Sequence, residues 1–317
     1  MPCTLRLGGA CNESCLFCTL EKKEKKEGMD TDEAKQKIHD LSCMDDDAIT
    51  VTGGEPTIRD DIIELLDLSK DCGFSIIELQ TNGLMLEDKA IAKEITDRVQ
   101  TVLFALHSHR KDISDRITGE KSFEKKIRAL GNLSASGVNV TVSHVINKLN
   151  HADLSGFVEF ISRHPGKINI YFSFVRPCGN ARNNRWIVPK LSETELDICK
   201  ALSLCEKKGI YYHIEGMPLC YLCGHEHHSS ELLRDCEKPF VYCGPDESGH
   251  KNLHEFGKNS LKVKAQICRL CSLDSICEGV WKEYGEIHGL DELYPVFSDK
   301  EKILRNVKTF FERRKRQ

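Results

Sequence analysis

The sequence predicts an α/β protein in which six successive βα units surround a parallel sheet, followed by a smaller segment held together by metal. Two observations support this fold class. Over the first 210 residues, short β-branched runs alternate with longer helical patterns, which is typical of βα units. From about Tyr211 onward this rhythm is lost, and seven cysteines and several histidines occur by Cys277.

Each unit has a strand pattern followed by a helix pattern. The predicted strands are Thr4–Leu7, Ala48–Thr52, Ser75–Gln80, Thr101–Leu106, Val138–Ile146 and Lys167–Val175. The predicted helices are Asp32–Cys43, Asp60–Cys72, Asp88–Asp97, Ser122–Ser136, Ala152–Arg163 and Ser192–Lys208. Lys300–Gln317 has the pattern of an amphipathic basic helix, which we expect to pack on the surface.

The composition is that of a globular protein. With 317 residues, 40% hydrophobic content and 30% charge, the chain has enough apolar surface for a sizeable core. A net charge of −4 provides no overall basic field, so a nucleic-acid substrate is not favoured. No apolar run approaches the length of a membrane span, which predicts no membrane partner.

The chain has sixteen cysteines, and their placement indicates metal binding rather than disulfides. The start of the sequence lacks the apolar core of a signal peptide, so we expect a cytoplasmic protein with reduced thiols. The thiols gather at residues 11–18 and 220–277, where metal ligation is the natural use of several cysteines. Isolated Cys43, Cys72, Cys199 and Cys205 fit helix or core packing.

Polar or glycine-rich segments follow every predicted strand. In parallel barrels, the loops at the carboxyl ends of the strands build the active site, so these segments are expected to converge on one rim. In chain order they are the 11–18 cysteine loop, Thr52–Pro56, Thr81–Gly83, His107–Ser108, His144–Asn147 and Arg176–Ala181.

The first cysteine loop places Cys11, Cys15 and Cys18 within eight residues. A closed zinc site needs four ligands, whereas three thiolates suit an iron–sulfur cluster whose remaining iron stays open. The spacing Cys-x3-Cys-x2-Cys, with Phe17 before the last cysteine, and Gly53-Gly54-Glu55-Pro56 after the second strand together resemble the radical S-adenosylmethionine (SAM) superfamily.

This resemblance covers roughly residues 3–210 and implies a partial, six-unit (β/α)6 TIM-like barrel, which we assign to residues 1–210. It also implies a [4Fe–4S] cluster on Cys11, Cys15 and Cys18 whose open iron takes the amino and carboxylate groups of SAM. The loop Gly53, Gly54, Glu55 and Pro56 is implied to bind the SAM amino group, with Phe17 close to the adenine. Further cofactor or substrate contacts are expected among Thr81, Asn82, Ser108, His144, Asn147 and Arg176, although each fits an ordinary hydrogen-bonding role as well.

The mechanism implied by the resemblance is reductive cleavage of SAM. An external one-electron donor of the flavodoxin or ferredoxin type reduces the cluster, and a 5′-deoxyadenosyl radical then abstracts hydrogen from a substrate carbon.

The second cysteine group contains Cys268, Cys271 and Cys277 in a Cys-x2-Cys-x5-Cys pattern, which resembles the auxiliary-cluster region of SPASM and twitch domains. Full SPASM domains have a further cysteine where this chain has Trp281, so we expect a twitch-like domain at 211–299 with one additional [4Fe–4S] cluster. The separate basic helix then takes 300–317.

Candidates for the fourth ligand of this cluster are Cys220, Cys223, Cys236 and Cys243, and we favour Cys220. Cys223 is a candidate hydrogen-atom donor to a substrate radical, as in some peptide-epimerising relatives, with a buried structural thiol as the alternative. Zinc is the alternative metal, since cysteine pairs and nearby histidines could form a tetrahedral site. We expect His225, His227 and His228 to face solvent rather than bind metal.

Three functions remain open. The first is a radical SAM enzyme that modifies a ribosomally made peptide or protein. The second is a twitch-type radical SAM enzyme that acts on a small metabolite. The third is a non-catalytic iron–sulfur protein, which would explain both cysteine groups but not the glycine-rich strand ends.

Overall fold

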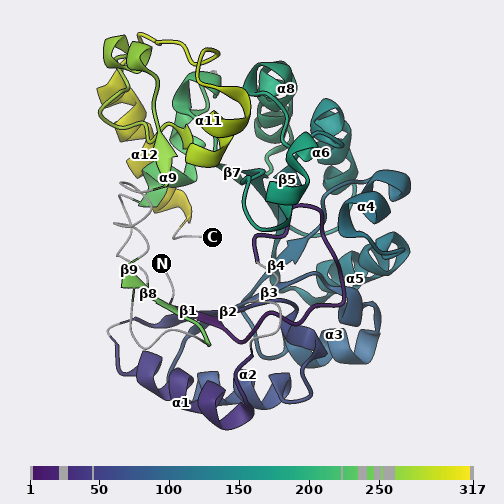
Figure 1. The fold of residues 1–317 in the computed structure, drawn as a ribbon. Coiled ribbons are helices and arrows are strands. Elements are labelled where there is room, and N and C mark those ends of the chain that lie inside the picture. The colour runs from purple at the N-terminus through teal and green to yellow at the C-terminus, as the bar shows by residue number, and fades with distance from the viewer. Residues whose placement is uncertain are drawn as a thin grey trace.

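The computed structural model describes residues 3–20, 28–44, 46–222, 224–234, 241–245, 251–252 and 261–314, and these form an open α/β barrel (Figure 1). The curved sheet has the strand order β7-β6-β5-β4-β3-β2-β1-β8-β9. Neighbouring strands are parallel except for β8 and β9, which pair antiparallel. The strands are β1 (Cys3–Arg6), β2 (Ala48–Thr52), β3 (Ile76–Thr81), β4 (Thr101–Ala105), β5 (Asn139–Ile146), β6 (Ile168–Phe174), β7 (Tyr212–Glu215), β8 (Val241–Cys243) and β9 (Lys251–Asn252).

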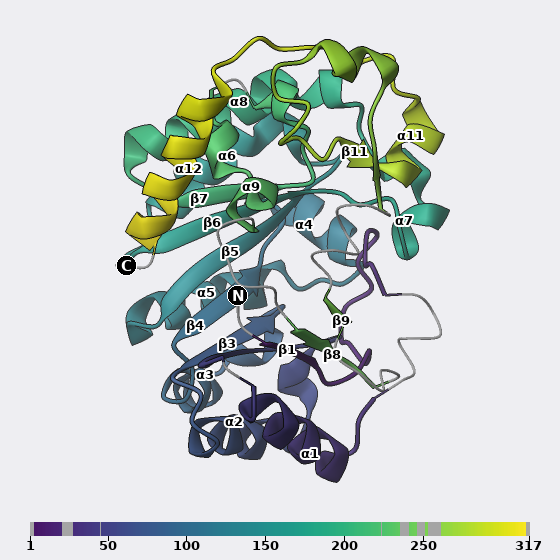
Figure 2. The same ribbon diagram turned by 90° about the vertical axis from the view of Figure 1, so that its left-hand side faces the viewer.

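Helices cover the outer face of this sheet, as both views show (Figures 1 and 2). Those that follow the strands of the sheet are α1 (Thr31–Ser42), α2 (Ile62–Asp71), α3 (Lys89–Thr96), α4 (Lys111–Thr118), α5 (Phe123–Ser136), α6 (Leu154–Ser162), α7 (Asn180–Asn183) and α8 (Leu191–Lys208). The later helices are α9 (Ser230–Arg234), α11 (Lys282–His288) and α12 (Lys300–Arg314).

The predicted fold class is confirmed. All six predicted strands and all six predicted helices of the βα units are present, with boundaries that differ by at most two residues. The sheet extends further than the six units, because β7 pairs with β6 at one edge and β8 pairs with β1 at the other. Among the described residues, β7 and β9 are the two edges, so the barrel is not closed.

Alternation along the strands separates an apolar outer layer from a polar interior. In β6, Ile170, Phe172 and Phe174 are buried beneath the helices, whereas Tyr171 and Ser173 on the other face are only partly buried. Each fully buried side chain of this size contributes about 1.5–3 kcal/mol relative to exposure. The apolar layer therefore holds the sheet together and leaves the concave face for polar groups.

The C-terminal segment packs against the barrel beyond β7. Its short strands β10 (Lys262–Val263) and β11 (Val280–Trp281) pair antiparallel and enclose the stretch that contains Cys268, Cys271 and Cys277. The hydroxyl of Tyr284, in α11, accepts a 2.9 Å hydrogen bond from the backbone N–H of Leu191, at the start of α8. The predicted C-terminal helix is confirmed by α12, and residues 315–317 lie outside the described part.

None of the described helices is long and apolar enough to cross a membrane.

Candidate active site

The first cysteine loop lies at the carboxyl end of β1 and is held from two sides. The backbone N–H groups of Ser14 and Leu16 donate to the carbonyls of Thr118 and Ile117 at the end of α4, both at 2.9 Å. From α7, the N–H of Asn180 donates to the Cys18 carbonyl at 2.8 Å, and its side-chain amide donates to the Cys15 carbonyl at 2.7 Å. Helices α4 and α7, which follow β4 and β6, therefore fix the backbone that carries the three thiols.

The three thiols have the chemistry of a site for a positively charged cluster. Cys11 is exposed, whereas Cys15 and Cys18 are partly buried. The Glu13 N–H lies 3.4 Å from Cys11 Sγ, and the Asn82 side-chain amide lies 3.7 Å from the same sulfur. Burial raises the pKa of Cys15, and the neighbouring carboxylate of Glu13 raises it further. Iron bound by the thiolates would offset this cost, so the residues present fit an iron–sulfur cluster with one side open.

The glycine-rich loop after β2 packs directly on the cysteine loop. The N–H of Glu55 donates to the carbonyl of Ala10 at 2.8 Å. Gly54 has a φ of +46°, and a Cβ at this position would lie 1.9 Å from the Ala10 carbonyl oxygen. Only glycine allows this approach between the two backbones. The two motifs that suggested a SAM site are therefore in contact in the folded chain.

The Glu55 carboxylate joins the ends of β2 and β3. It is 1% exposed, and its Oε1 accepts hydrogen bonds from the Thr57 N–H at 3.0 Å and from the hydroxyls of Thr57 and Thr81, both at 2.6 Å. Its Oε2 accepts from the Asn82 N–H at 2.6 Å. Burial raises the pKa of Glu55, while these hydrogen bonds oppose the rise. Both carboxylate oxygens are thus engaged by protein donors.

Glu13 and Lys126 form a buried ion pair that sequence reasoning missed. Lys126 Nζ lies 3.2 Å from Glu13 Oε2, and it also donates to the carbonyls of Asn82 and Ala105 at 2.9 and 3.0 Å. The other oxygen of Glu13 accepts from the Ser122 hydroxyl at 2.8 Å. This network ties the cysteine loop to the ends of β3 and β4. A sequence signal existed, because Lys126 shares the buried face of α5 with Ala129, Leu130 and Leu133.

Phe17 and Asn82 lie at the mouth of the barrel. Phe17 is 8% exposed, and its ring meets that of His107 edge-to-face with 4.8 Å between centroids. The Asn82 side-chain amide donates to Asn12 Oδ1 at 2.7 Å, which orients it beside Cys11. The structure therefore brings the predicted residues Phe17, Thr81 and Asn82 together with the glycine-rich loop and the thiols.

Ser108, His144 and Asn147 have local structural contacts instead. Ser108 Oγ accepts from the Arg110 N–H at 3.0 Å, and the Asn147 side chain bonds the backbone of Val145 and Leu149 at 2.9 and 3.0 Å. His144 lies on the helix-facing side of β5, where its ring centroid is 4.0 Å from that of Phe157 in α6. The structure does not bring these three side chains to the thiols.

Arg176 connects the barrel mouth to the C-terminal segment. Its guanidinium lies 4.8 Å from the centroid of the Trp281 ring and 4.0 Å from Glu283. Among the described residues, its buried Nε–H has no hydrogen-bond acceptor. Arg176 is therefore a donor at the junction of the two parts rather than a member of the cysteine loop's network.

The second cysteine group converges as predicted from the spacing. Cys220, Cys268, Cys271 and Cys277 line one small, largely apolar cavity with Leu219, Leu273 and Leu293. Burial raises the pKa of Cys220 to about 12, and the nearby Cys277 and Cys268 add to the rise. Cys220 comes from the 3-10 helix η6 (Leu219–Tyr221), whereas the other three cysteines come from the stretch between β10 and β11.

Backbone N–H groups point at the sulfur atoms of this group. Leu273 and Val296 each donate to Cys271 Sγ at 3.4 Å, and Gly279 donates to Cys277 Sγ at 3.4 Å. Such donors stabilise thiolates and tune iron–sulfur clusters. Of the alternative fourth ligands, Cys243 lies in β8 beside β1, whereas Cys223 and Cys236 lie outside the described residues. The proposed donor role of Cys223 is thus not addressed by the structure.

The expectation that the histidines face solvent is wrong for two of them. His225 and His228 are each 7% exposed because they pack against Tyr212 in β7. His227 and His228 line a cavity that shares no residue with the cysteine cavity. Cysteines and histidines therefore do not form a joint tetrahedral site in the described part of the chain.

Comparisons with known proteins agree with this geometry. Residues 5–161 match the Radical SAM superfamily. The mycofactocin maturase MftC of Mycobacterium tuberculosis is 30% identical over 178 residues, which cover 56% of this chain and 45% of the relative. A probable GTP 3′,8-cyclase of Saccharolobus islandicus is 29% identical over 182 residues, 55% of this chain and 57% of the relative. The chain thus spans about half the length of these curated relatives.

Solved structures with the same fold cover nearly the whole chain. The protein anSMEcpe, solved with bound AdoMet and the Kp18Cys peptide, matches 99% of this chain and 97% of its own at a TM-score of 0.67 and 15% identity. SuiB of Streptococcus suis, solved with S-adenosylmethionine, matches 93% of this chain and 76% of its own at a TM-score of 0.61 and 15% identity. The similarity in fold therefore includes the C-terminal segment.

Proposed function

We propose that this chain, which belongs to the radical SAM superfamily, is an enzyme that cleaves SAM reductively and abstracts hydrogen from a substrate carbon. One observation carries the proposal: the three-thiol loop and the glycine-rich loop are joined by the Glu55–Ala10 hydrogen bond, and Asn82 places its amide beside Cys11. A cluster on Cys11, Cys15 and Cys18 would thus lie next to the backbone that can receive the amino group of SAM.

When bound, the reduced [4Fe–4S] cluster supplies the electron that splits SAM into methionine and a 5′-deoxyadenosyl radical. The protein residues position the reactants for this step. Glu55 fixes the glycine-rich loop, the Glu13–Lys126 pair fixes the cysteine loop, and Phe17 provides an apolar surface for the adenine. Thr81 acts through Glu55, because its hydroxyl donates to that carboxylate.

A second [4Fe–4S] cluster is proposed on Cys220, Cys268, Cys271 and Cys277. Its support is the single cavity that these four cysteines line and the N–H donors aimed at Cys271 and Cys277. With four protein ligands this cluster would have no open iron, so it would carry electrons or shape the substrate site rather than bind SAM. Zinc at the same four thiols is the alternative, and iron analysis separates the two.

The substrate proposed first is a ribosomally made peptide or protein. The match to a mycofactocin maturase over 178 residues supports this choice, as does the shared fold with proteins solved in complex with peptides. Arg176 and Trp281 lie between the barrel mouth and the C-terminal segment, where a peptide would reach the cluster side of the sheet. The electron donor is proposed to be an external flavodoxin or ferredoxin, and reduced thiols with an oxygen-labile cluster fit the cytoplasm.

A small metabolite is the second candidate substrate. The specific observation in its favour is the match to a probable GTP 3′,8-cyclase, which is nearly as similar to this chain as the maturase is. The sequence matches alone do not separate the two classes, because both relatives are about equally identical to this chain over matches of similar length.

Anaerobic turnover with deuterated candidates tests the assignment and separates the substrate classes. Iron-reconstituted protein is incubated with SAM, reductant and either perdeuterated candidate peptides or deuterated nucleotides, and 5′-deoxyadenosine is examined by mass spectrometry. Deuterium transferred from a peptide supports the first proposal, and transfer from a nucleotide supports the second. If iron-loaded protein forms no 5′-deoxyadenosine under any of these conditions, the SAM-cleaving function itself is contradicted.

A further inference from the structure

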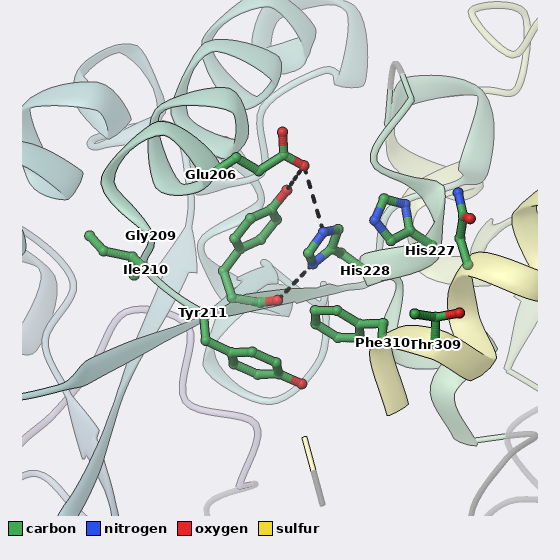
Figure 3. A pocket seen from close by; sticks show the side chains of 10 residues that line it. Glu206, Gly209, Ile210, Tyr211, His227, His228, Thr309 and Phe310 are labelled. Carbon is green, nitrogen blue, oxygen red and sulfur yellow. Dashed lines mark hydrogen bonds and ion pairs between the residues drawn. The ribbon is translucent and has the colours of Figure 1, made fainter. Parts of the chain in front are cut away.

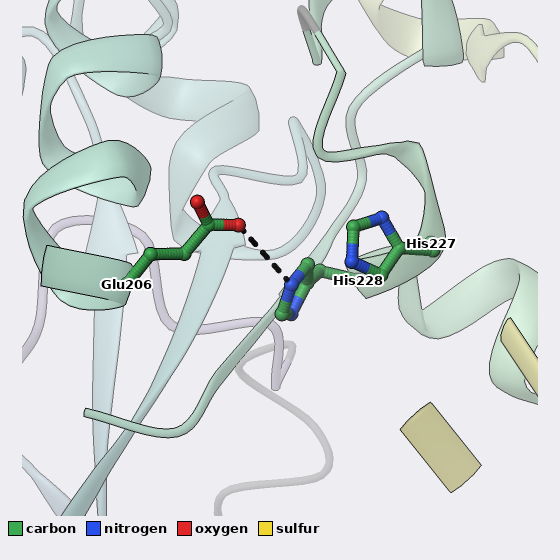
Figure 4. A group of neighbouring side chains, drawn as sticks. All are labelled: Glu206, His227 and His228. Carbon is green, nitrogen blue, oxygen red and sulfur yellow. Dashed lines mark ion pairs between the residues drawn. The ribbon is translucent and has the colours of Figure 1, made fainter. Parts of the chain in front are cut away.

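A further group of side chains that could hold a metal ion lies outside both cysteine groups. Glu206, in the last turn of α8, and His227 and His228, in the 3-10 helix η7 (Glu226–His228), place one ligand atom each within 4.8 Å of the others (Figure 4). They line a cavity of about 510 Å³ at the start of β7 (Figure 3). This is the amino end of the strand, whereas the cysteine loop follows the carboxyl end of β1.

His228 presents a lone pair to Glu206. Its Nδ1 lies 3.0 Å from the Tyr212 carbonyl oxygen, which can only accept a hydrogen bond, so the ring proton is on Nδ1. The other nitrogen, Nε2, lies 3.8 Å from Glu206 Oε1. A carboxylate oxygen and a ring nitrogen therefore face each other, an arrangement that a bound cation would stabilise.

Neighbouring side chains hold Glu206 in place. Its Oε1 accepts from the Tyr212 hydroxyl at 3.2 Å and lies 3.1 Å from His225 Nδ1. The second nitrogen of His225 lies 3.2 Å from the Ser203 hydroxyl, so His225 has partners at both ends of its ring. His225 supports the carboxylate in the way that outer groups orient metal ligands, and it is not itself a ligand.

We propose that Glu206, His227 and His228 bind a divalent transition-metal ion, with Zn²⁺ as the best fit. Two imidazole nitrogens and one carboxylate oxygen suit zinc, whereas Mg²⁺ and Ca²⁺ prefer oxygen ligands only. The fourth position would face the cavity and take a water molecule. The ion would link the end of α8 to η7. The ring centroids of His228 and Phe310 lie 4.3 Å apart, so fixing His228 would also stabilise the packing of α12.

Zinc retention by the iron-loaded protein tests this proposal. Protein with its iron–sulfur clusters fully reconstituted under anaerobic conditions is equilibrated with ZnCl₂ and a chelator of known affinity, and zinc and iron are then measured together by mass spectrometry. We expect about one zinc per chain in addition to the iron, as the three-ligand site requires. Glu206→Gln and His227→Asn remove one ligand each, so each is expected to lower the zinc affinity at least tenfold with unchanged iron.

The matched controls carry the same two types of substitution, Glu to Gln and His to Asn, at residues outside the cavity. Glu159→Gln and His164→Asn change one carboxylate and one imidazole outside the cavity, and zinc retention is expected to equal that of the unaltered protein. Zinc should also raise the thermal unfolding midpoint of the unaltered protein and of both controls, but not that of Glu206→Gln. The proposal is overturned if the iron-loaded protein retains no zinc, or if Glu206→Gln and His227→Asn retain as much as the controls.

Discussion

Lys126 Nζ lies 3.2 Å from Glu13 Oε2, and the two side chains are 0% and 2% exposed. Glu13 is part of the cysteine loop, between Cys11 and Cys15, whereas Lys126 comes from a helix on the outer face of the barrel. The lysine also donates to the carbonyls of Asn82 and Ala105, so a single ammonium group links the cysteine loop to the ends of two strands. This pair is therefore a central support of the candidate active site.

Replacing Lys126 with methionine should destabilise the protein strongly. The substitution leaves the Glu13 carboxylate buried without its cation, and breaking a buried pair in this way costs about 3–5 kcal/mol. The free energy of unfolding, measured anaerobically with a chemical denaturant, should fall by this amount. The double variant Glu13→Gln with Lys126→Met should recover part of the loss, since no buried charge is left unpaired.

Lys125→Met is the matched control, one residue earlier on the same helix. Lys125 pairs with Glu87 at 2.9 Å, but its side chain is 51% exposed, so its loss should cost less than about 1 kcal/mol. Equal costs for the two variants would show that the buried pair does not support the loop.

Gly54→Ala should prevent the cysteine loop from meeting the glycine-rich loop. The new Cβ would lie 1.9 Å from the Ala10 carbonyl oxygen, so one of the two backbones must move. We expect loss of SAM-induced change in the electron paramagnetic resonance signal of the reduced protein. Gly137→Ala is the control, because Gly137 also has a positive φ, of +83°, but a Cβ there meets nothing within 4 Å. It should cost about 1 kcal/mol from backbone strain alone and retain the SAM response.

Cys220→Ala should remove one cluster and leave the other. With two [4Fe–4S] clusters the reconstituted chain binds about eight irons, and loss of a ligand to the second should reduce this to about four. Cys199→Ala, which removes a thiol of α8 outside the cavity, should keep about eight. About four irons in the unaltered chain, with zinc in the remaining site, would instead favour the zinc alternative.

The stability should fall in acid through Glu231. Its carboxylate pairs with Lys262 at 2.5 Å, and although burial alone would raise its pKa, the charges of Lys262 and Arg234 lower it from 4.5 to about 2. Because the pKa in the folded state lies below that in the unfolded state, the unfolded chain takes up the proton first as the pH falls. The free energy of unfolding of the unaltered protein should therefore exceed that of Glu231→Gln above pH 4.5. This difference should shrink between pH 4.5 and about 2. A difference that does not change across this window would argue against the ionised pair.

Local patterns were sufficient to predict the barrel and the cysteine loops. The alternation that marks β3 to β6 is strong because one face of each strand is buried under helices, as Phe172 and Phe174 show in β6. Strand β7 was missed because Tyr212–Glu215 is short, half polar and follows directly on a long helix. Helix α4 was missed because six of its eight residues, in the sequence KDISDRIT, are charged or hydroxylated.

The contacts between distant parts of the chain were not predictable from these patterns. Glu13 resembles an ordinary surface charge, and although Lys126 shares the apolar face of its helix, only the fold shows that the two side chains meet across 113 residues. Glu55 belongs to the loop that is implied to bind the SAM amino group, and only the fold shows that its carboxylate has partners at Thr81 and Asn82, which end and follow the next strand. His228 was expected to face solvent. Its ring instead contacts the rings of Tyr212, which precedes it in the sequence, and Phe310, which follows it.

The most direct test of the proposed function is the formation of 5′-deoxyadenosine from SAM by the reconstituted protein under dithionite without oxygen. Cys15→Ala removes one of the three thiols on which the cluster depends, while Cys199→Ala removes a thiol outside both cysteine groups. The proposal predicts 5′-deoxyadenosine from the unaltered protein and from Cys199→Ala, and none from Cys15→Ala. Cleavage of SAM that persists in Cys15→Ala, or that is absent from the fully iron-loaded unaltered protein, would contradict it.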